Sequence, residues 1–122
     1  FSPCMLDSVA DGIVEQQEDE YMSISSLLSN KAKEDYPALR YIDGSTRAQV
    51  VKQENNPDLY NLLKCFQELS GHGVLVNTAL CRPGEALVCA PEDALSVFMG
   101  TDLKFLILED VLVTKRKEPE NW

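Results

Sequence analysis

Two polar segments of the sequence place an arginine beside glycine, hydroxyl and amide side chains. A guanidinium can bind two oxygens of a phosphate at once, and glycine allows backbone N–H groups to approach a ligand closely. This combination indicates a site for a small anion. In the first segment, residues 43–49, the candidate ligand residues are Asp43, Gly44, Thr46, Arg47 and Gln49.

The second segment follows the apolar run 74–76, which has the character of a buried strand. Polar side chains at the end of such a strand face the crevice where α/β sheets usually bind ligands. The alternative is a turn whose side chains cap their own backbone. The candidate residues in this segment are Asn77, Thr78, Ala79, Arg82, Gly84 and Glu85.

Arg47 is the strongest single candidate, and it is expected to bind phosphate oxygens. Its alternative is a surface arginine paired with a nearby acid. Glu85 is expected to order its loop by pairing with Arg47 or Arg82, with contact to a nucleotide ribose as the alternative. Ala79 can add a backbone N–H to a ligand site but no hydroxyl.

The remaining polar residues have more limited roles. Asp43 is expected to cap or orient its loop and to stay ionised beside an arginine, with a lowered pKa, which makes it a poor general base. Thr46 and Gln49 are secondary hydrogen-bonding candidates. His72 is the only histidine, and none of the four cysteines forms Cys-x-x-Cys, so no metal site is expected.

Apolar periodicity predicts the elements that position these segments. Asn56 is a good helix cap with Pro57 after it, and that helix is expected to stop at Gly71 with its Leu/Phe stripe, 59–69, in the core. Helices and strands alternate irregularly, which predicts an α/β or α+β fold with a mixed sheet. We expect helices at 5–17, 57–70 and from 91, strands at 21–28, 39–42, 48–52, 74–76, 86–89, 105–108 and 111–113, and a charged loop at 29–35.

Taken together and in order, these segments resemble the C-terminal region of the NodU/CmcH-type O-carbamoyltransferases, which include tobramycin and cephalosporin carbamoyltransferases. The family has four sequence patterns in the same order and with the same spacing as here: D-G-T-x-R-x-Q-T-V, N-P, N-T-S-F-N-x-x-G-E-P-I-V and T-P-x-D-A. Two departures remove polar groups, because Ala79 stands where the family has Ser and Cys81 where it has Asn. The similar segments are residues 1–3, 37–51, 56–66, 71–88 and 90–98.

The resemblance implies a YrdC-like fold, a twisted mixed sheet with packed helices, of which residues 1–122 are the C-terminal part and 115–122 a tail. It implies that carbamoyl phosphate and ATP are substrates, that they form carbamoyl-adenylate, and that the carbamoyl group then passes to a hydroxyl acceptor. Arg47 is implied in holding carbamoyl phosphate. An upstream Kae1-like domain, absent from this sequence, would bind the metal and the acceptor, so this chain alone is expected to be weakly active or inactive.

Composition narrows the classes of partner. The net charge of −9 and pI of about 4.5 argue against nucleic acid, whose binding depends on neutralising phosphates. No apolar run is long enough to span a bilayer. The cysteines are expected to be free, mostly buried thiols in a reducing cytoplasm. The alternative function is a catalytically silent binding or docking module derived from the same family, which the two lost polar residues favour and Arg47 opposes.

Overall fold

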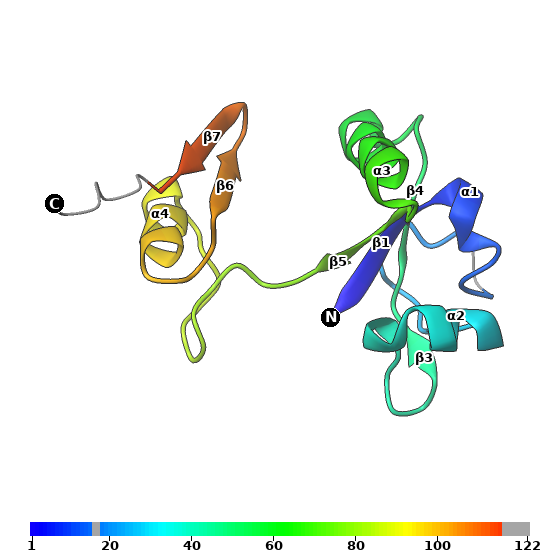
Figure 1. Ribbon diagram of the computed structural model, residues 1–122. Helices are drawn as coiled ribbons and strands as arrows, with labels where there is room; N and C mark the ends of the chain where they lie inside the picture. Colours follow the sequence, from blue (N-terminus) through cyan, green and yellow to red (C-terminus); the bar gives the residue numbers. More distant parts are fainter. Residues whose placement is uncertain (16–17, 116–122) are drawn as a thin grey trace, which may run out of the picture. The chain divides into compact units, whose positions relative to one another are not determined.

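The computed structural model describes residues 1–15 and 18–115, and the chain divides into two compact units, Phe1–Thr78 and Ala79–Trp122. The first unit contains the three-stranded sheet and most of the helices, and the second contains one helix and a hairpin (Figure 1).

A three-stranded sheet with β1 (Ser2–Leu6) at its centre organises the first unit. β1 pairs in parallel with β4 (Gln49–Val51) and antiparallel with β5 (Val74–Asn77). Every residue from Pro3 to Leu6 is buried. A short strand that is buried on both faces needs no polar alternation, which fits its sequence, SPCML.

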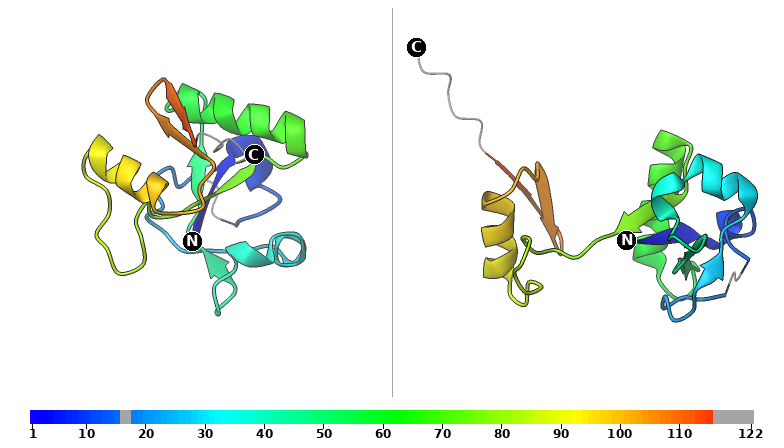
Figure 2. Two further views of the ribbon diagram at one scale, coloured as in Figure 1. Left: turned by 60° about the vertical axis from the view of Figure 1, so that its left-hand side comes forward. Right: turned by 90° about the horizontal axis from the view of Figure 1, so that it is seen from below.

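Helices cover both faces of this sheet, so neighbouring residues of β1 enter different cores (Figures 1 and 2). On one face, α3 (Pro57–Ser70) packs Leu63 against Cys4, Leu6 and Val51. On the other face, Met5 and Val50 belong to a core with residues of α1 (Asp7–Ala10) and α2 (Asn30–Asp35).

Shorter elements complete the two units. In the first, β2 (Ser26–Leu27) pairs antiparallel with β3 (Ser45–Thr46), and η1 (Pro37–Leu39) is a single 3₁₀ turn. In the second, β6 (Phe105–Leu108) and β7 (Val111–Thr114) form a hairpin, and α4 (Pro91–Met99) packs on it. The core of the second unit contains Ala94, Phe98 and Leu106.

The structure confirms a mixed α+β fold and the elements with the clearest signals. α3 starts after Asn56, whose side chain accepts a hydrogen bond from the Leu59 N–H, and it ends before Gly71. β4, β5, α4 and the β6–β7 hairpin also lie where they are expected. The YrdC-like classification stays a prediction, and of the expected tail only Lys115 lies within the described residues.

The predicted helix 5–17 is wrong for most of its length. Residues 5–6 belong to β1, only Asp7–Ala10 is helical, and Val14 forms a bridge with Leu28. The apolar spacing is real, but its residues enter two cores instead of one helical stripe: Leu6 lies in the core on the α3 side, and Ala10, Ile13 and Val14 lie in the other. Residues 16–17 of this prediction lie outside the described residues.

Three further predictions in the first unit also need correction. The charged segment 29–35 is helical, because the Ser29 hydroxyl caps the Ala32 N–H and Ala32 is buried. The expected strand at 39–42 is not found among the described residues: Leu39 ends η1, and residues 40–42 lead into the turn that the Gly44 N–H closes on the Tyr41 carbonyl. In the expected strand 21–28 only β2 is extended, since the Asp19 carboxylate accepts the N–H groups of Tyr21 and Ile24 and curls the chain.

Burial departs from expectation in three places. Within the α3 stripe Leu63 is buried, but Leu62 and Leu69 are exposed. Among the free cysteines only Cys4 is buried. Burial raises the pKa of its thiol, although backbone hydrogen bonds act in the opposite direction.

The strand expected at residues 86–89 is not found among the described residues. Their one hydrogen bond of the kind that joins strands runs from the Val88 N–H to the Leu80 carbonyl.

The buried α3 contact gives a first prediction. Leu63→Ala should lower the free energy of unfolding of the first unit by about 2–5 kcal/mol, because it leaves a cavity against β1. Leu69→Ala, at a position 88% exposed on the same helix, should change it by less than about 0.5 kcal/mol. Urea unfolding followed by tyrosine fluorescence measures this unit, since all four tyrosines precede residue 78. Equal effects of the two variants would contradict the packing described.

Candidate functional site

The loop at residues 43–49 is shaped by hydrogen bonds to the Asp43 carboxylate. Its Oδ1 accepts the Ser45 backbone N–H at 2.9 Å and the Ser45 hydroxyl at 2.7 Å. These bonds hold the pKa of Asp43 below its ordinary value. Gly44, at φ 82°, takes the left-handed conformation that the turn requires. The expected capping role and lowered pKa are therefore present, but Ser45 causes them and no arginine contributes.

Arg47 is exposed and free of partners. Within residues 1–15 and 18–115, its side chain makes no hydrogen bond or ion pair. The paired surface arginine that the sequence left open is therefore not what the structure shows. An unpaired guanidinium on a loop that follows a buried strand is available to an anion.

Strand register brings Arg47 and Asn77 to the same end of the sheet. Asn77 pairs directly with Ser2 at the start of β1, and Gln49 begins β4 opposite Cys4. Because β4 runs parallel to β1, Arg47 precedes Gln49 on the side where Ser2 lies. β4 and β5 flank β1, so two strand spacings, about 10 Å, separate their backbones.

A second contact places the same loop at this end of β1. The Tyr41 hydroxyl lies 3.4 Å from the Ser2 hydroxyl, and the Gly44 N–H donates to the Tyr41 carbonyl at 3.0 Å. The turn that carries Arg47 is thus joined to the first residues of β1. Asn77 is exposed there, with its amide 3.9 Å from the Met22 sulfur.

The other residues of the first segment differ in access. Thr46 is fully buried, and its hydroxyl has no partner among the described residues, so a ligand at the surface does not reach it. Gln49 is half-buried and lines a small pocket of about 70 Å³ together with Glu20 and Asn55. Lys33 is a residue of this region that the sequence did not indicate. Its side chain lies over Gly44, where an added Cβ would be 3.8 Å from Nζ.

The second candidate segment divides between the units. Asn77 and the exposed Thr78 end the first unit, and Ala79 begins the second. The expected Pro-Gly turn is confirmed: the Glu85 N–H donates to the Arg82 carbonyl at 3.0 Å, with Gly84 at φ 83°. This is the geometry of a type II turn, which needs a positive φ at its third residue.

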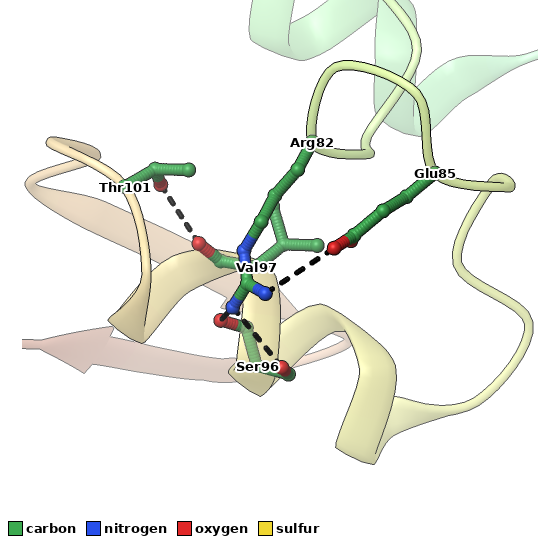
Figure 3. A network of polar contacts seen from close by, with 5 residues as sticks. All are labelled: Arg82, Glu85, Ser96, Val97 and Thr101. Atoms are coloured by element: carbon green, nitrogen blue, oxygen red, sulfur yellow. Dashed lines mark hydrogen bonds and ion pairs between the residues drawn. The ribbon is translucent and has the colours of Figure 1, made fainter.

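Arg82 is held by its own unit (Figure 3). Its guanidinium forms an ion pair with Glu85 at 3.4 Å and donates from Nη2 to the Ser96 carbonyl at 2.5 Å and the Ser96 hydroxyl at 3.2 Å. The Ser96 carbonyl belongs to the last turn of α4, where a cation is favourable. Gly100 makes room for this contact, because a Cβ there would clash with the guanidinium.

Glu85 therefore takes the ordering ion pair expected for it, with Arg82 as partner. It also lines a pocket of about 240 Å³ in the second unit, beside Leu87 and Asp93. The ligand roles predicted for Arg82, Gly84, Glu85 and Ala79 stay predictions.

Neither a metal cluster nor a membrane span is found in the part of the chain that the structure describes. No three His, Cys, Asp or Glu side chains are gathered there in a way that could hold a metal. The described helices include none with the length and apolar character needed to cross a bilayer. His72 is exposed in its turn, where the Tyr36 hydroxyl lies 3.0 Å from Nδ1.

Comparison with known proteins adds a family match over almost the whole chain. A family model described as "Carbamoyltransferase C-terminus" matches residues 1–115. An uncharacterized protein of Synechocystis is 38% identical over 104 residues, which are 85% of this chain and 17% of that protein.

Several of the matched relatives have functional names. The nodulation protein NolNO of Sinorhizobium fredii is 28% identical over 100% of this chain and 19% of its own length. The 3'-hydroxymethylcephem-O-carbamoyltransferase of Amycolatopsis lactamdurans is 33% identical over 70% of this chain and 16% of its own length. The chain spans about a fifth of the length of the curated relatives it matches.

The Asp43 turn gives a prediction about pH. Since the folded pKa of Asp43 lies below its unfolded value of about 3.9, its ionised form stabilises the fold above that value, and this contribution is lost as pH falls through the folded pKa. Carboxyl NMR should show Asp43 titrating below ordinary Asp, and the stability difference between wild type and Asp43→Asn should shrink over that range. Titration at or above the ordinary Asp value would contradict the turn geometry.

The Arg82 contact predicts a stability effect confined to the second unit. Arg82→Ala should weaken the end of α4 by about 1–3 kcal/mol, because it removes charged hydrogen bonds to Ser96. Hydrogen exchange of the Gly100 amide, which donates to the Ser96 carbonyl, measures this directly. Gly100→Ala should reproduce part of the effect by displacing the guanidinium. If the Gly100 exchange rate in Arg82→Ala equals that in the exposed control Lys104→Ala, the Arg82 contact does not stabilise the end of α4.

Proposed function

Because the chain belongs to the carbamoyltransferase C-terminus family, we propose that it forms the carbamoyl phosphate and ATP side of an O-carbamoyltransferase. In the proposed reaction, water hydrolyses carbamoyl phosphate to carbamate and phosphate. A carbamate oxygen then attacks the α-phosphorus of ATP, which gives carbamoyl-adenylate and releases pyrophosphate. The acceptor's hydroxyl oxygen then attacks the carbamoyl carbon, AMP leaves, and the hydroxyl proton is released. The contribution of this chain is positioning and electrostatic stabilisation of anionic groups, which requires no nucleophile from it.

The observation that carries this proposal is the exposed, unpaired Arg47 at the end of the sheet to which register also brings Asn77. The guanidinium supplies a fixed charge and a two-pronged donor for phosphate oxygens. The Asn77 amide can donate to a carbonyl or phosphate oxygen and accept from an amide such as that of a carbamoyl group. Lys33, over Gly44, adds a second positive charge near the loop.

The proposal places the chain within a longer enzyme. Relatives of which it spans about a fifth have room for the Kae1-like domain that would bind the metal and the acceptor. The named cephem carbamoyltransferase supports a hydroxyl as the group that accepts the carbamoyl. We place the enzyme in the cytoplasm, where exposed thiols such as Cys65 and Cys89 stay reduced.

The test is ligand-induced stabilisation of the 122-residue chain by carbamoyl phosphate. A ligand that binds only the folded state at ten times its Kd adds about 1.4 kcal/mol to the free energy of unfolding. Wild type should therefore show a concentration-dependent rise in Tm, and Arg47→Ala should lose most of it. Inorganic phosphate, measured in parallel, shows how much of the effect belongs to phosphate alone.

Arg40→Ala is the matched control. Arg40 is also an exposed arginine of the first unit, seven positions before Arg47, and within the described residues its side chain makes no hydrogen bond or ion pair. It removes the same charge, so it should keep the Tm rise. An equal loss in both variants would mean that general charge, and no defined site, attracts the anion, and the proposal would fail.

A silent docking module is the competing interpretation, favoured by Ala79 and Cys81 and by the engagement of Arg82 within its own unit. Restoring the family residues with Ala79→Ser and Cys81→Asn tests it. A clear gain of carbamoyl phosphate affinity in this variant, from none in wild type, would identify a degenerate site. Wild-type binding that the changes leave unaltered would support the enzymatic proposal.

A further inference from the structure

Asp43 and Arg47 carry opposite charges four positions apart, yet they form no ion pair. Both side chains are exposed, and the Arg47 side chain is long and flexible. Ion pairs between exposed groups are weak but favourable, at about 0.2–1 kcal/mol. Something in the loop therefore keeps the carboxylate occupied.

Ser45 occupies it with two hydrogen bonds. Its backbone N–H and its hydroxyl both donate to Asp43 Oδ1, at 2.9 and 2.7 Å. The Ser45 side chain is buried, with 6% of the residue exposed, so its hydroxyl has a fixed position between strand and turn. Hydrogen bonds to an ionised acceptor are roughly twice as strong as neutral ones.

Ser25 fixes the Ser45 hydroxyl in turn. The two hydroxyl oxygens lie 3.1 Å apart. Because a hydroxyl has one proton and Ser45 gives its own to Asp43, Ser25 must be the donor to Ser45. The result is a hydrogen-bond chain in which Ser25 donates to Ser45 and Ser45 donates to the Asp43 carboxylate, which is thereby bound within its own turn.

We propose that Ser45 is a positioning residue of the anion site: by holding the Asp43 carboxylate in the turn, it leaves the Arg47 guanidinium unpaired and open to a phosphate-bearing ligand. The inference rests on the proposed function for the identity of the ligand, but the hold on Asp43 can be measured without any ligand. Loss of the Ser45 hydroxyl removes the shorter of the two hydrogen bonds to Asp43 Oδ1 and leaves only the bond from the Ser45 backbone N–H. The carboxylate is then held more weakly and can compete for Arg47, four residues along the chain.

The ligand-free test is the pKa of Asp43, followed by carboxyl NMR. In the wild-type background, Arg47→Ala should leave this pKa unchanged, because no ion pair joins the two side chains and Ser45 is what lowers the pKa of Asp43. In the Ser45→Ala background, Arg47→Ala should raise it, because a pair has formed and is then lost. The pKa of Asp43 is also measured with Lys33→Ala in both backgrounds, because Lys33 lies near Gly44 and its effect must be separated from that of Arg47. Equal responses to Arg47→Ala in the two backgrounds would overturn the proposal.

The binding test uses the 122-residue chain with carbamoyl phosphate and inorganic phosphate. Ser45→Ala should weaken binding by up to about fivefold, the upper limit set by a competing exposed ion pair. Adding Asp43→Asn should restore it, and this gain should exceed the gain from Asp43→Asn alone, which corrects for the removed charge. Ser25→Ala is the graded comparison: it removes the donor that orients the Ser45 hydroxyl but leaves both Ser45 bonds to Asp43, so it should weaken binding less than Ser45→Ala does.

The outcomes separate the two proposals. If wild type binds and Ser45→Ala binds equally, only the role of Ser45 fails. If wild type binds neither anion, the proposed function fails and the anion role of Ser45 fails with it. Rescue by Asp43→Asn excludes simple misfolding as the cause of a loss. Should Ser45→Ala not fold, Ser45→Cys gives the same test, because a thiol fills the position but is a weak donor.

Discussion

The double pairing of β1 is the constraint on which the first unit depends. Residues 4–6 of β1 pair with β4 on one side, residues 2–5 pair with β5 on the other, and helices bury both faces. A one-residue slip in either pairing would exchange Met5 with Cys4 and Leu6 between the two cores, so the register is strongly specified. The same register sets where the loops before β4 and after β5 end, and so brings Arg47 and Asn77 to one edge.

The two arginines of the candidate segments show how local hydrogen bonding decides the use of a charge. Arg82 is held by Glu85 and by the last turn of α4, with Gly100 leaving the space. Arg47 has an acid nearby as well, but Ser45 holds that carboxylate in its own turn. A charge becomes available to a ligand when its neighbours are satisfied elsewhere. The structure thus separates one arginine that stabilises its unit from one that is free to bind.

Local signals in the sequence were enough for part of this structure. Asn56-Pro57 and the apolar run 74–76 have one dominant interpretation, and α3 and β5 lie where they predict. The helical apolar spacing within residues 5–17 conceals that residues 5–6 end a strand, which only pairing with the distant strands β4 and β5 decides. The segment 29–35 has a single buried residue, too little to show a helical stripe.

The candidate site was predictable in its residue types and not in its partners. The Arg82 contact with Ser96 spans 14 positions, and the Ser25–Ser45 bond spans 20, so neither follows from spacing.

The account would be tested most directly by amide NMR of the labelled chain titrated with carbamoyl phosphate. It predicts the largest shifts at residues 43–49 and 77–78, and their loss in Arg47→Ala. Shifts centred elsewhere, or unaffected by that change, would contradict an anion site at the end of the β4–β1–β5 sheet.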